Sequence, residues 1–198
     1  MNDTKTRILD AAEKLFGEKG FDGTSLRDIT TEADVNLAAV NYHFQSKDSL
    51  IEAVIMRGAG PMNEQRLAML EAAGPNATIE QIIEAFIAPV FEQDFEPMAP
   101  LMARVLASPE LMVRILKRHM DSLSRRFADA IAVALPDLSP IERIWRLNFT
   151  AGAMAHTITR APVLKEVFGG ALNISDRKLT IARLVAFAAA GFRAPEVH

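Results

Sequence analysis

The sequence of 198 residues contains no cysteine, one tryptophan and one tyrosine. Without cysteine the chain forms no disulfide and performs no thiolate chemistry, which is typical of proteins that stay inside the cell. Its longest apolar run, at residues 184–192, is far shorter than the roughly 20 residues that a membrane span needs. The first residues are polar and begin a helical pattern directly, so no secretory leader is expected. These absences predict a cytoplasmic protein with no membrane partner.

Signatures of catalysis are missing as well. The sequence has no G-x-S-x-G elbow, no P-loop and no dinucleotide-binding glycine pattern. The four histidines lack metal-ligand spacing, and no clustered carboxylates accompany them. We therefore predict that the chain is not an enzyme and holds no metal ion and no cofactor.

An excess of positive charge is also missing. The chain carries 22 Lys and Arg against 25 Asp and Glu, and residues 1–50 alone carry six against nine, a net charge of −3 in both cases. Because DNA-binding domains are usually basic, this composition argues against DNA. Four cations nevertheless fall at helix starts or early turns, where they would face a duplex: Lys5, Arg7, Arg27 and Lys47. We expect modest non-specific affinity for DNA.

What is present is helical periodicity along the whole chain, with no strand pattern and no repeat. The spacing predicts an all-α fold, with a three-helix N-terminal domain at residues 1–46 and a helical C-terminal domain at residues 47–198. We expect the helix that starts at Lys47 to kink or break near Gly58–Pro61. Of the other predicted helices, the first is capped by Asp3 or Thr4 and stopped by Gly20, and the second starts near Leu26. The remaining ones cover residues 37–43, 79–93, 100–107, 110–135, 141–160 and 176–192.

The stretch Thr24–Leu50 reads as two short helices joined by a tight turn, with the start of a third. Ser25 caps the first of them, and Asp28 completes a capping box three residues later. Asp34 stands where the turn needs a left-handed backbone, which aspartate tolerates. Asn36 then caps the next helix.

The helix over residues 37–43 turns Val40 and Phe44 toward a core. Its outward face bears Leu37, Ala38, Asn41 and Tyr42. Such a face is unusual for solvent but suits the major groove of DNA. The Asn41 amide can pair bidentately with adenine, the two apolar side chains can touch a thymine methyl group, and the phenol can reach a phosphate oxygen.

These residues resemble the TetR-type transcriptional regulators, which are most often repressors. The matching positions are Ile8, Ala11, Ala12, Leu15, Phe16, Gly20, Phe21, Thr24, Ile29, Ala33, Val35, His43, Phe44, Ser46, Lys47 and Leu50. Two positions depart from the family pattern. Asp34 replaces the usual turn glycine, and Asn41 stands where a tyrosine is common.

The resemblance implies a double-stranded DNA operator as partner and a homodimer that reads two half-sites. The residues that it implies for DNA contact are Thr24, Ser25, Arg27, Asn36, Leu37, Ala38, Asn41, Tyr42, His43 and Lys47. Lys47 lies in the first turn of its helix, where exposed amides and an ammonium group can hold a phosphate together.

The resemblance also implies a small-molecule effector and a dimer interface in the C-terminal domain. The candidate ligand-binding residues are Met56, Phe86, Phe91, Met102, Leu106, Met112, Phe149 and His156, although core packing explains many of them equally well. The candidate dimer residues are Trp145, Gly152, Leu184, Phe187 and Gly191. Residues 141–193 resemble, more loosely, a subgroup associated with fatty-acid metabolism, which makes a fatty acid or an acyl-thioester one candidate effector.

Two alternatives remain open at this point. The chain could be a helical small-molecule binding protein that acts through a protein partner without DNA, an interpretation that the acidic N-terminal domain supports. It could also be a ligand-independent regulator with a filled core, which no feature of the sequence excludes.

Overall fold

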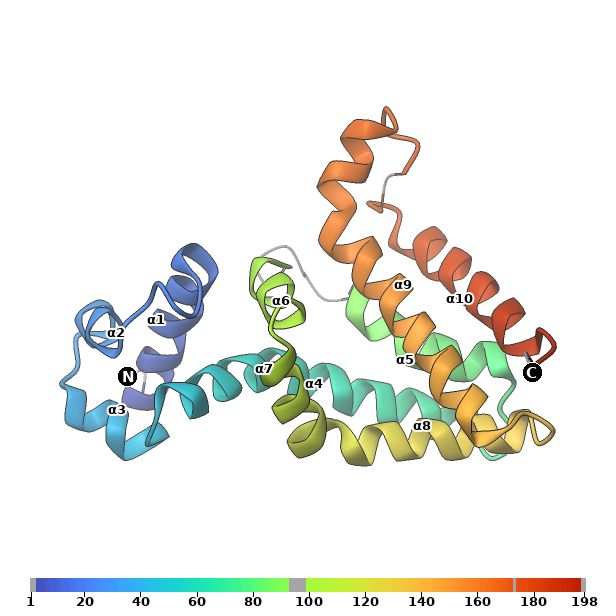
Figure 1. Ribbon diagram of the computed structural model, residues 1–198, viewed down its shortest axis with the longest axis horizontal. Coiled ribbons are helices and arrows are strands. Elements are labelled where there is room, and N and C mark those ends of the chain that lie inside the picture. Colours follow the sequence, from blue (N-terminus) through green and yellow to red (C-terminus); the bar gives the residue numbers. More distant parts are fainter. Residues whose placement is uncertain (1–2, 93–98, 173, 197–198) are drawn as a thin grey trace. The chain divides into compact units, whose positions relative to one another are not determined.

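The computed structural model describes residues 3–92, 99–172 and 174–196 (Figure 1). Within these ranges every regular element is helical, so the predicted all-α fold is confirmed. None of the described helices combines the length and the apolar character that crossing a membrane requires. The elements are α1 (Thr4–Lys19), α2 (Leu26–Ala33), α3 (Leu37–Phe44), α4 (Lys47–Ala73), α5 (Ile79–Glu92), α6 (Ala99–Leu106), α7 (Pro109–Ile115), the π-helical turn η1 (Leu116–Met120), α8 (Asp121–Ala134), α9 (Pro140–Val167) and α10 (Arg177–Arg193).

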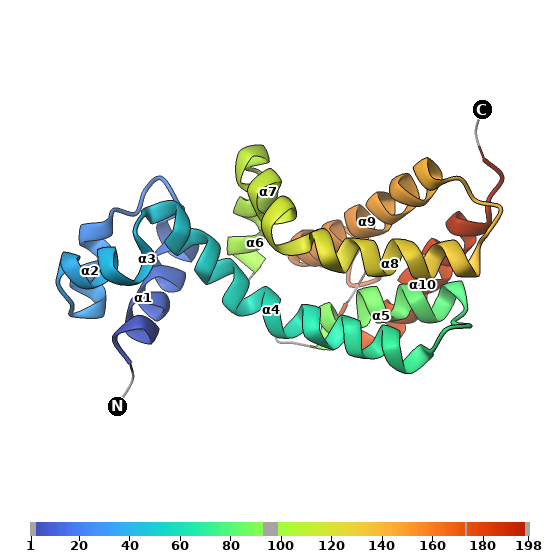
Figure 2. The same ribbon diagram turned by 90° about the horizontal axis from the view of Figure 1, so that it is seen from below.

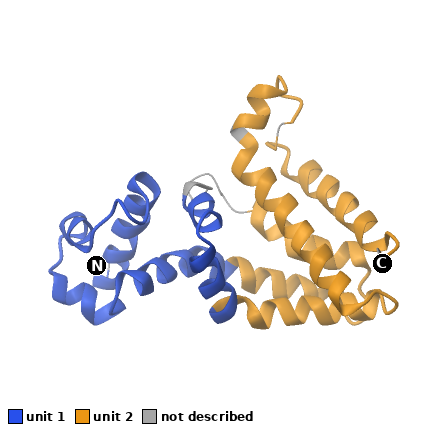
Figure 3. Ribbon diagram, viewed as in Figure 1, with its two compact units in different colours: residues 1–61, 96–118 blue, residues 62–95, 119–198 orange. Residues whose placement is uncertain are grey.

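The chain divides into two compact units, which Figure 3 colours separately. Unit 1 contains residues 1–61 and 96–118, and unit 2 contains residues 62–95 and 119–198. Helix α4 runs from the first unit into the second. The predicted boundary between the DNA-binding domain and the C-terminal domain, at residues 46 and 47, lies inside unit 1. The two compact units do not test this functional boundary, which stays a prediction.

Unit 1 is built around the apolar stripe that the spacing predicts for the first helix. Because α2 contacts both α1 and α3, and α3 also contacts α1, these three helices share one core. Its buried residues include Ile8, Leu9, Ala12, Leu15 and Phe16 of α1, Ile29 of α2, Val40 and Phe44 of α3, and Leu50 and Val54 of α4. Gly20 ends α1 at a φ of 81°, and a β-carbon there would lie only 2.6 Å from Arg104 Nη1 of α6.

Unit 2 packs α5 against α8 and α10, and α9 against α8 and α10 (Figures 1 and 2). Small residues such as Ala85 and Ala189 lie among the buried residues of α5 and α10 and let the two backbones approach closely. The large apolar side chains of this core include Ile79, Ile82, Ile83, Ile87 and Phe91 of α5, Phe127 and Ile131 of α8, and Ile181 and Phe192 of α10.

Helix α4 excludes the break that was one of the two predictions for this segment, because it continues through Gly58–Pro61 without ending. Pro61 removes one intrahelical hydrogen bond, and a proline in a helix interior costs about 3 kcal/mol. Val54 and Ile55 before it and Met62 after it are buried. Each such side chain contributes about 1.5–3 kcal/mol on burial, so the burial on both sides outweighs the proline.

The predicted helix over residues 110–135 is helical as far as residue 134, but it is not one α-helix, because it divides into α7, η1 and α8. Its buried positions, such as Leu111, Ile115, Leu123 and Phe127, fall at multiples of four residues. Because an α-helix has about 3.6 residues per turn, side chains four residues apart drift gradually around the helix. The wider i→i+5 turn of η1 contains more residues and brings the buried positions back to one face. Helix α9 extends to Val167, beyond the predicted residue 160.

An ion pair joins the first turn of α5 to the last turn of α10. Arg193 Nη1 lies 2.5 Å from Glu80 Oε1, and Arg193 Nη2 donates to Glu80 Oε2 at 2.7 Å. The guanidinium of Arg193 holds the pKa of the Glu80 carboxyl at about 2, below its ordinary value of 4.5. The pair is half-exposed, so its net contribution is that of a surface pair, about 0.2–1 kcal/mol.

We expect Glu80→Gln to lower the free energy of unfolding by about 0.5 kcal/mol at pH 7. Because the folded pKa of Glu80 is depressed, its stabilisation is complete above about pH 4.5 and is lost as the pH falls toward 2. Urea unfolding at pH 7, 4 and 2.5 should show the wild-type advantage shrinking with acidity. Glu84→Gln, one turn along α5, is the matched control, and an equal pH dependence in both variants would contradict this account.

Candidate nucleic-acid interface

The N-terminus of α2 carries the predicted capping box. The Asp28 backbone N–H donates to Ser25 Oγ at 3.2 Å, and the Ser25 backbone N–H donates to Asp28 Oδ2 at 2.8 Å. Hydrogen bonds from the Ser25 hydroxyl and backbone lower the pKa of the Asp28 carboxyl. Ser25 and Arg27 are both exposed at this helix start, as a contact with a phosphate requires.

Thr24 requires a correction, because its side chain is fully buried with 0% exposure. Its hydroxyl oxygen lies 2.8 Å from the Gly20 carbonyl oxygen and 3.1 Å from that of Leu15. The hydroxyl therefore fastens the segment after α1 to the end of that helix. It is not available for DNA, and we withdraw it from the predicted contact residues.

The turn between α2 and α3 has the predicted left-handed residue. Asp34 adopts φ 51° and ψ 54°, and the N–H of Val35 donates to the Thr30 carbonyl at 3.0 Å. Arg7 of α1 donates through Nη2 to the carbonyl oxygens of Ala33 at 2.5 Å and Asp34 at 2.6 Å. A cation at a helix C-terminus is favourable, and here it locks the turn onto α1.

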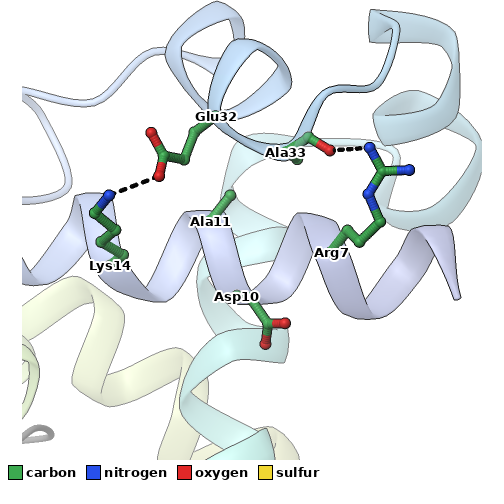
Figure 4. Close-up of a pocket in the computed structure, with 6 residues that line it drawn as sticks. All are labelled: Arg7, Asp10, Ala11, Lys14, Glu32 and Ala33. Atoms are coloured by element: carbon green, nitrogen blue, oxygen red, sulfur yellow. Dashed lines mark hydrogen bonds and ion pairs between the residues drawn. The ribbon is translucent and has the colours of Figure 1, made fainter. Parts of the chain in front are cut away.

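Figure 4 shows the crevice of about 270 Å³ that this contact closes at one end. At the other end Lys14 Nζ of α1 lies 2.6 Å from Glu32 Oε1 of α2. Both contacts bridge α1 and α2, so the crevice belongs to the scaffold of the domain. Arg7 is consequently held in the turn, which corrects the expectation that it faces a duplex.

The outward face of α3 is as the sequence predicts. Leu37 is 43% exposed and Tyr42 is 83% exposed, while Val40 and Phe44 are buried. Ala38 and Asn41 are exposed between them. The face thus presents an amide, a phenol and two apolar side chains on one short helix, the groups that base edges, thymine methyls and phosphates contact.

The ends of α3 account for the neighbouring candidates. Asn36 Oδ1 accepts the Ala39 backbone N–H at 2.9 Å, which leaves the Asn36 amide nitrogen as a donor for phosphate. His43 is half-buried, with its ring edge-to-face with Tyr42 at 5.1 Å, so it supports the phenol from below. Lys47 is half-buried in the first turn of α4, which Ser46 caps by accepting the Ser49 N–H at 3.1 Å.

The acidic character of the domain is partly neutralised within unit 1. Arg57 of α4 pairs with Asp10 at 2.6 Å and with Glu13 of α1. Lys14 pairs with Glu32 as described above, and Arg7 Nη2 also lies 3.2 Å from Asp34 Oδ2, so these contacts engage four carboxylates. These pairs leave the net charge of the domain unchanged, but each of the four carboxylates has a cationic partner inside unit 1.

The structure separates the predicted ligand-binding residues. Met56, Met102, Leu106 and Met112 belong to unit 1, whereas Phe86, Phe91, Phe149 and His156 belong to unit 2. Leu106, Phe149 and His156 are exposed, which corrects their assignment to the lining of an enclosed cavity. A groove of about 780 Å³ between α5 and α10 is lined by other residues, among them Glu84, Ala88 and Val185.

The predicted dimer residues lie on open faces of α9 and α10. Trp145 is 51% exposed and Phe187 is 69% exposed, and Gly152 and Gly191 are also exposed. Leu184 is half-buried. Phe149 shares the face of Trp145, with the two ring centroids 5.6 Å apart. It therefore belongs to this apolar surface rather than to a ligand cavity.

Sequence reasoning missed two features. Gln45, which follows α3, has a φ of 60°, a conformation that glutamine rarely adopts and that no sequence signal announces. Arg66 is buried in unit 2 although it is charged. Its signal was present in the sequence, because it lies four residues from both Met62 and Leu70, which share the buried stripe of α4.

Comparison with known families covers both ends of the chain. The model described as "Bacterial regulatory proteins, tetR family" matches residues 8–54, which contain α2 and α3. The model described as "Tetracyclin repressor-like, C-terminal domain" matches residues 84–191. The second match alone covers more than half of the chain.

Individual relatives agree with these matches. The probable HTH-type transcriptional regulator YttP of Bacillus subtilis is 36% identical over 89 residues, which cover 45% of this chain and 41% of the relative. The HTH-type transcriptional regulator UidR of Escherichia coli is 26% identical over 135 residues, which cover 64% and 66%. Both alignments span less than two thirds of the relative's length. The fatty acid degradation regulator FadR from Bacillus halodurans shares the fold, with a TM-score of 0.70 and 16% identity over 98% of this chain and 99% of that one.

The turn at Asp34 offers a test of how the interface is held. Because its φ is 51°, we expect Asp34→Gly to retain the stability of the wild type and Asp34→Ala to fall about 1 kcal/mol below Asp34→Gly. Both variants keep the backbone carbonyls that Arg7 contacts. Chemical denaturation of the full chain measures the difference, and an alanine variant as stable as the glycine variant would refute the strain assigned to this turn.

Proposed function

We infer the function of this chain from its family: it belongs to the TetR family of bacterial regulatory proteins. We propose that it is a DNA-binding transcriptional repressor, released from a near-palindromic operator by a small apolar or amphipathic ligand. Members of this family are regulators and not enzymes. Its site of action would be the DNA of the bacterial cytoplasm.

The exposed face of α3 is the observation that carries this proposal. An isolated helix of eight residues is unstable, so the pattern of Leu37, Asn41 and Tyr42 on its outer side depends on how the rest of unit 1 holds it. In our proposal the Asn41 amide reads a base edge and the Tyr42 phenol positions the helix on a phosphate. The match of residues 8–54 to the family does not favour the alternative of a binding protein without DNA.

The apolar surface of α9 and α10 supports a homodimer. Ile141, Trp145, Phe149 and Phe187 are each more than half exposed. Exposed aromatic residues gathered on two helices are typical of an interaction surface. In a dimer with two-fold symmetry the same surface serves both protomers. Two recognition helices about one DNA turn apart, roughly 34 Å, would then read two half-sites.

Helices α6 and α7 provide a route from effector to DNA, because they belong to the same unit as the reading helix. Arg104 of α6 donates through Nη2 to the Gly17 carbonyl of α1 at 3.4 Å. The buried carboxylate of Glu52, in α4, pairs with Arg114 of α7 at 3.4 Å and with Arg118 of η1 at 3.0 Å. We propose that the effector shifts these helices and thereby α4, with a coupling of about 1–3 kcal/mol.

The finer identity of the effector is a further proposal. The looser resemblance of residues 141–193 to regulators of fatty-acid metabolism favours a fatty acid or an acyl-thioester. FadR from Bacillus halodurans, whose fold is similar, is named as a regulator of fatty acid degradation. Titration calorimetry with oleate and with decanoyl thioesters tests these ligands. If protein that binds its operator gave no heat of binding with either ligand, both would be eliminated as effectors.

Selection of bound duplexes from a random DNA pool should yield an inverted repeat. On that operator we expect Asn41→Ala to weaken binding about 10- to 100-fold and to relax the preference at one base position in each half-site. Tyr42→Ala should weaken binding to all sequences alike. Fluorescence anisotropy measures both affinities.

Glu64→Gln, an exposed change on the part of α4 that lies in unit 2, is the control and should leave operator affinity unchanged. If Asn41→Ala and Tyr42→Ala both bound the operator like the wild type, α3 would not be the reading helix. If no duplex were enriched from the pool by folded dimer, the repressor proposal would give way to the binding-protein alternative.

The dimer surface is tested by Phe187→Asp. We expect a folded monomer by light scattering, with operator binding at least about 10-fold weaker, because each half-site would be read alone and a charge would stand in the apolar contact. Val133→Asp is the matched control. Val133 is about as exposed as Phe187, but it lies on α8, outside the proposed dimer surface of α9 and α10. A dimeric Phe187→Asp protein would place the interface elsewhere.

A further inference from the structure

Arg66 is a charged side chain inside the core of unit 2. Its relative exposure is 5%, and it lies on α4 between the buried Met62 and Leu70. Its Nε donates to the Phe86 carbonyl at 2.8 Å, and its Nη1 donates to Asn63 Oδ1 at 3.0 Å. The guanidinium carbon stands 4.5 Å from the centroid of the Phe86 ring. Among the described residues, no carboxylate pairs with it.

Arg146 shows how this protein satisfies a buried arginine when its role is structural. Arg146 is 7% exposed, and it pairs with Glu142 at 2.9 Å. It also donates to the backbone carbonyls of residues 191, 192, 194 and 195, at the end of α10. Every side of that guanidinium therefore meets an oxygen. Arg66, by contrast, has one carbonyl, one amide and no anion.

The remaining acceptors around Arg66 are weak. Arg66 Nη2 reaches only the sulfur of Met154, at 3.8 Å, and Asn63 Nδ2 reaches only the sulfur of Met120, at 3.5 Å. Thioether sulfur is a poor acceptor, and methionine side chains are flexible enough to move aside. Because Asn63 Oδ1 accepts from Arg66, its amide donor is directed elsewhere. Two donors on neighbouring turns of α4 thus lack a strong acceptor.

The charge on Arg66 persists at neutral pH. Burial lowers the pKa of the Arg66 guanidinium to about 10, and no opposing carboxylate raises it. A buried cation without a counter-ion is costly, and in most proteins such a charge is paired or bound to a ligand. An anion that entered this core would find a cation already desolvated and aimed by its neighbours.

The surroundings of the guanidinium are otherwise apolar. Phe86 packs edge-to-face against Phe127 at 5.4 Å. The sulfur of Met154 contacts the guanidinium, and the sulfur of Met120 contacts the neighbouring Asn63. Met120 is the last residue of η1, and π-helical turns inside helices occur frequently at functional sites. An apolar body attached to the anion would be in contact with these side chains.

We propose that Arg66, with Asn63, anchors the carboxylate of an apolar carboxylic acid, whose oxygens replace the sulfurs of Met154 and Met120 as acceptors. This inference rests on the proposed function, because it names the chemical class of the effector. It assigns the acidic end of the ligand to α4 and the apolar end to the ring pair of Phe86 and Phe127.

The test uses the full-length protein and titration calorimetry with decanoate, with decanol and decyltrimethylammonium as neutral and cationic probes of equal chain length. Wild type should bind decanoate saturably and more tightly than either analogue. Arg66→Met should bind decanoate about 10- to 100-fold more weakly, and Arg66→Lys should lie between. Unchanged decanoate affinity in Arg66→Met, tighter binding of the cation, or no saturable decanoate binding by folded wild type overturns the proposal.

Ligand-free thermal unfolding supplies a readout that does not depend on any probe. Arg66→Met should melt at or above the wild-type temperature, because it removes an uncompensated charge, whereas Arg146→Met should melt well below it. A loss as large in Arg66→Met as in Arg146→Met would show a structural role and overturn the proposal. Operator binding by ligand-free wild type is measured in parallel. If operator binding is absent, only the repressor function is contradicted. If the protein binds its operator but does not bind decanoate, only the carboxylate site is contradicted.

Discussion

The burial of Val40 and Phe44 is the constraint on which the reading surface depends. Helix α3 has eight residues, too few to be stable in isolation, and it exists because these two side chains occupy the core shared with α1. Each contributes about 1.5–3 kcal/mol on burial. Once they point inward, helical geometry leaves Asn41 and Tyr42 no direction but outward. The chemistry of the surface is thus a consequence of packing on its other side.

Unit 2 carries a buried charge and exposed aromatic side chains that its own fold does not satisfy. Arg66 is a buried cation without a carboxylate, and Trp145 and Phe187 remain on the outside. Each of these features costs free energy in an isolated protomer. A buried charge without a counter-ion has lost its hydration, and exposed aromatic surface remains in contact with water. A repressor that dimerises and takes an acidic effector would resolve both. The proposed acidic effector would thus supply the anion that Arg66 lacks, and the second protomer would cover Trp145 and Phe187.

Local chemistry was readable from the sequence, and several predictions that rest on it are confirmed. The capping box of Ser25 and Asp28, the cap at Asn36 and the left-handed Asp34 depend on residues within a few positions of one another. Predictions that depend on distant contacts did less well. Thr24 was predicted to contact DNA, but its hydroxyl is buried against the carbonyl oxygens of Leu15 and Gly20. These acceptors come close to the hydroxyl only when the chain folds, so the sequence does not reveal them.

The sequence by itself determined the all-α class, the inward and outward faces of the short helices and the resemblance to a DNA-binding family. The class and the faces follow from the 3.6-residue period and from capping, which act over one or two turns. The resemblance rests instead on the matching positions between Ile8 and Leu50. Only the tertiary structure decided that α4 passes through Pro61, that Arg7 is held in the turn at Asp34 and that the buried Arg66 has no anionic partner. The physical reason is the same in all three cases. Whether a broken hydrogen bond is offset, or a charge is paired, depends on which distant side chains packing brings to it.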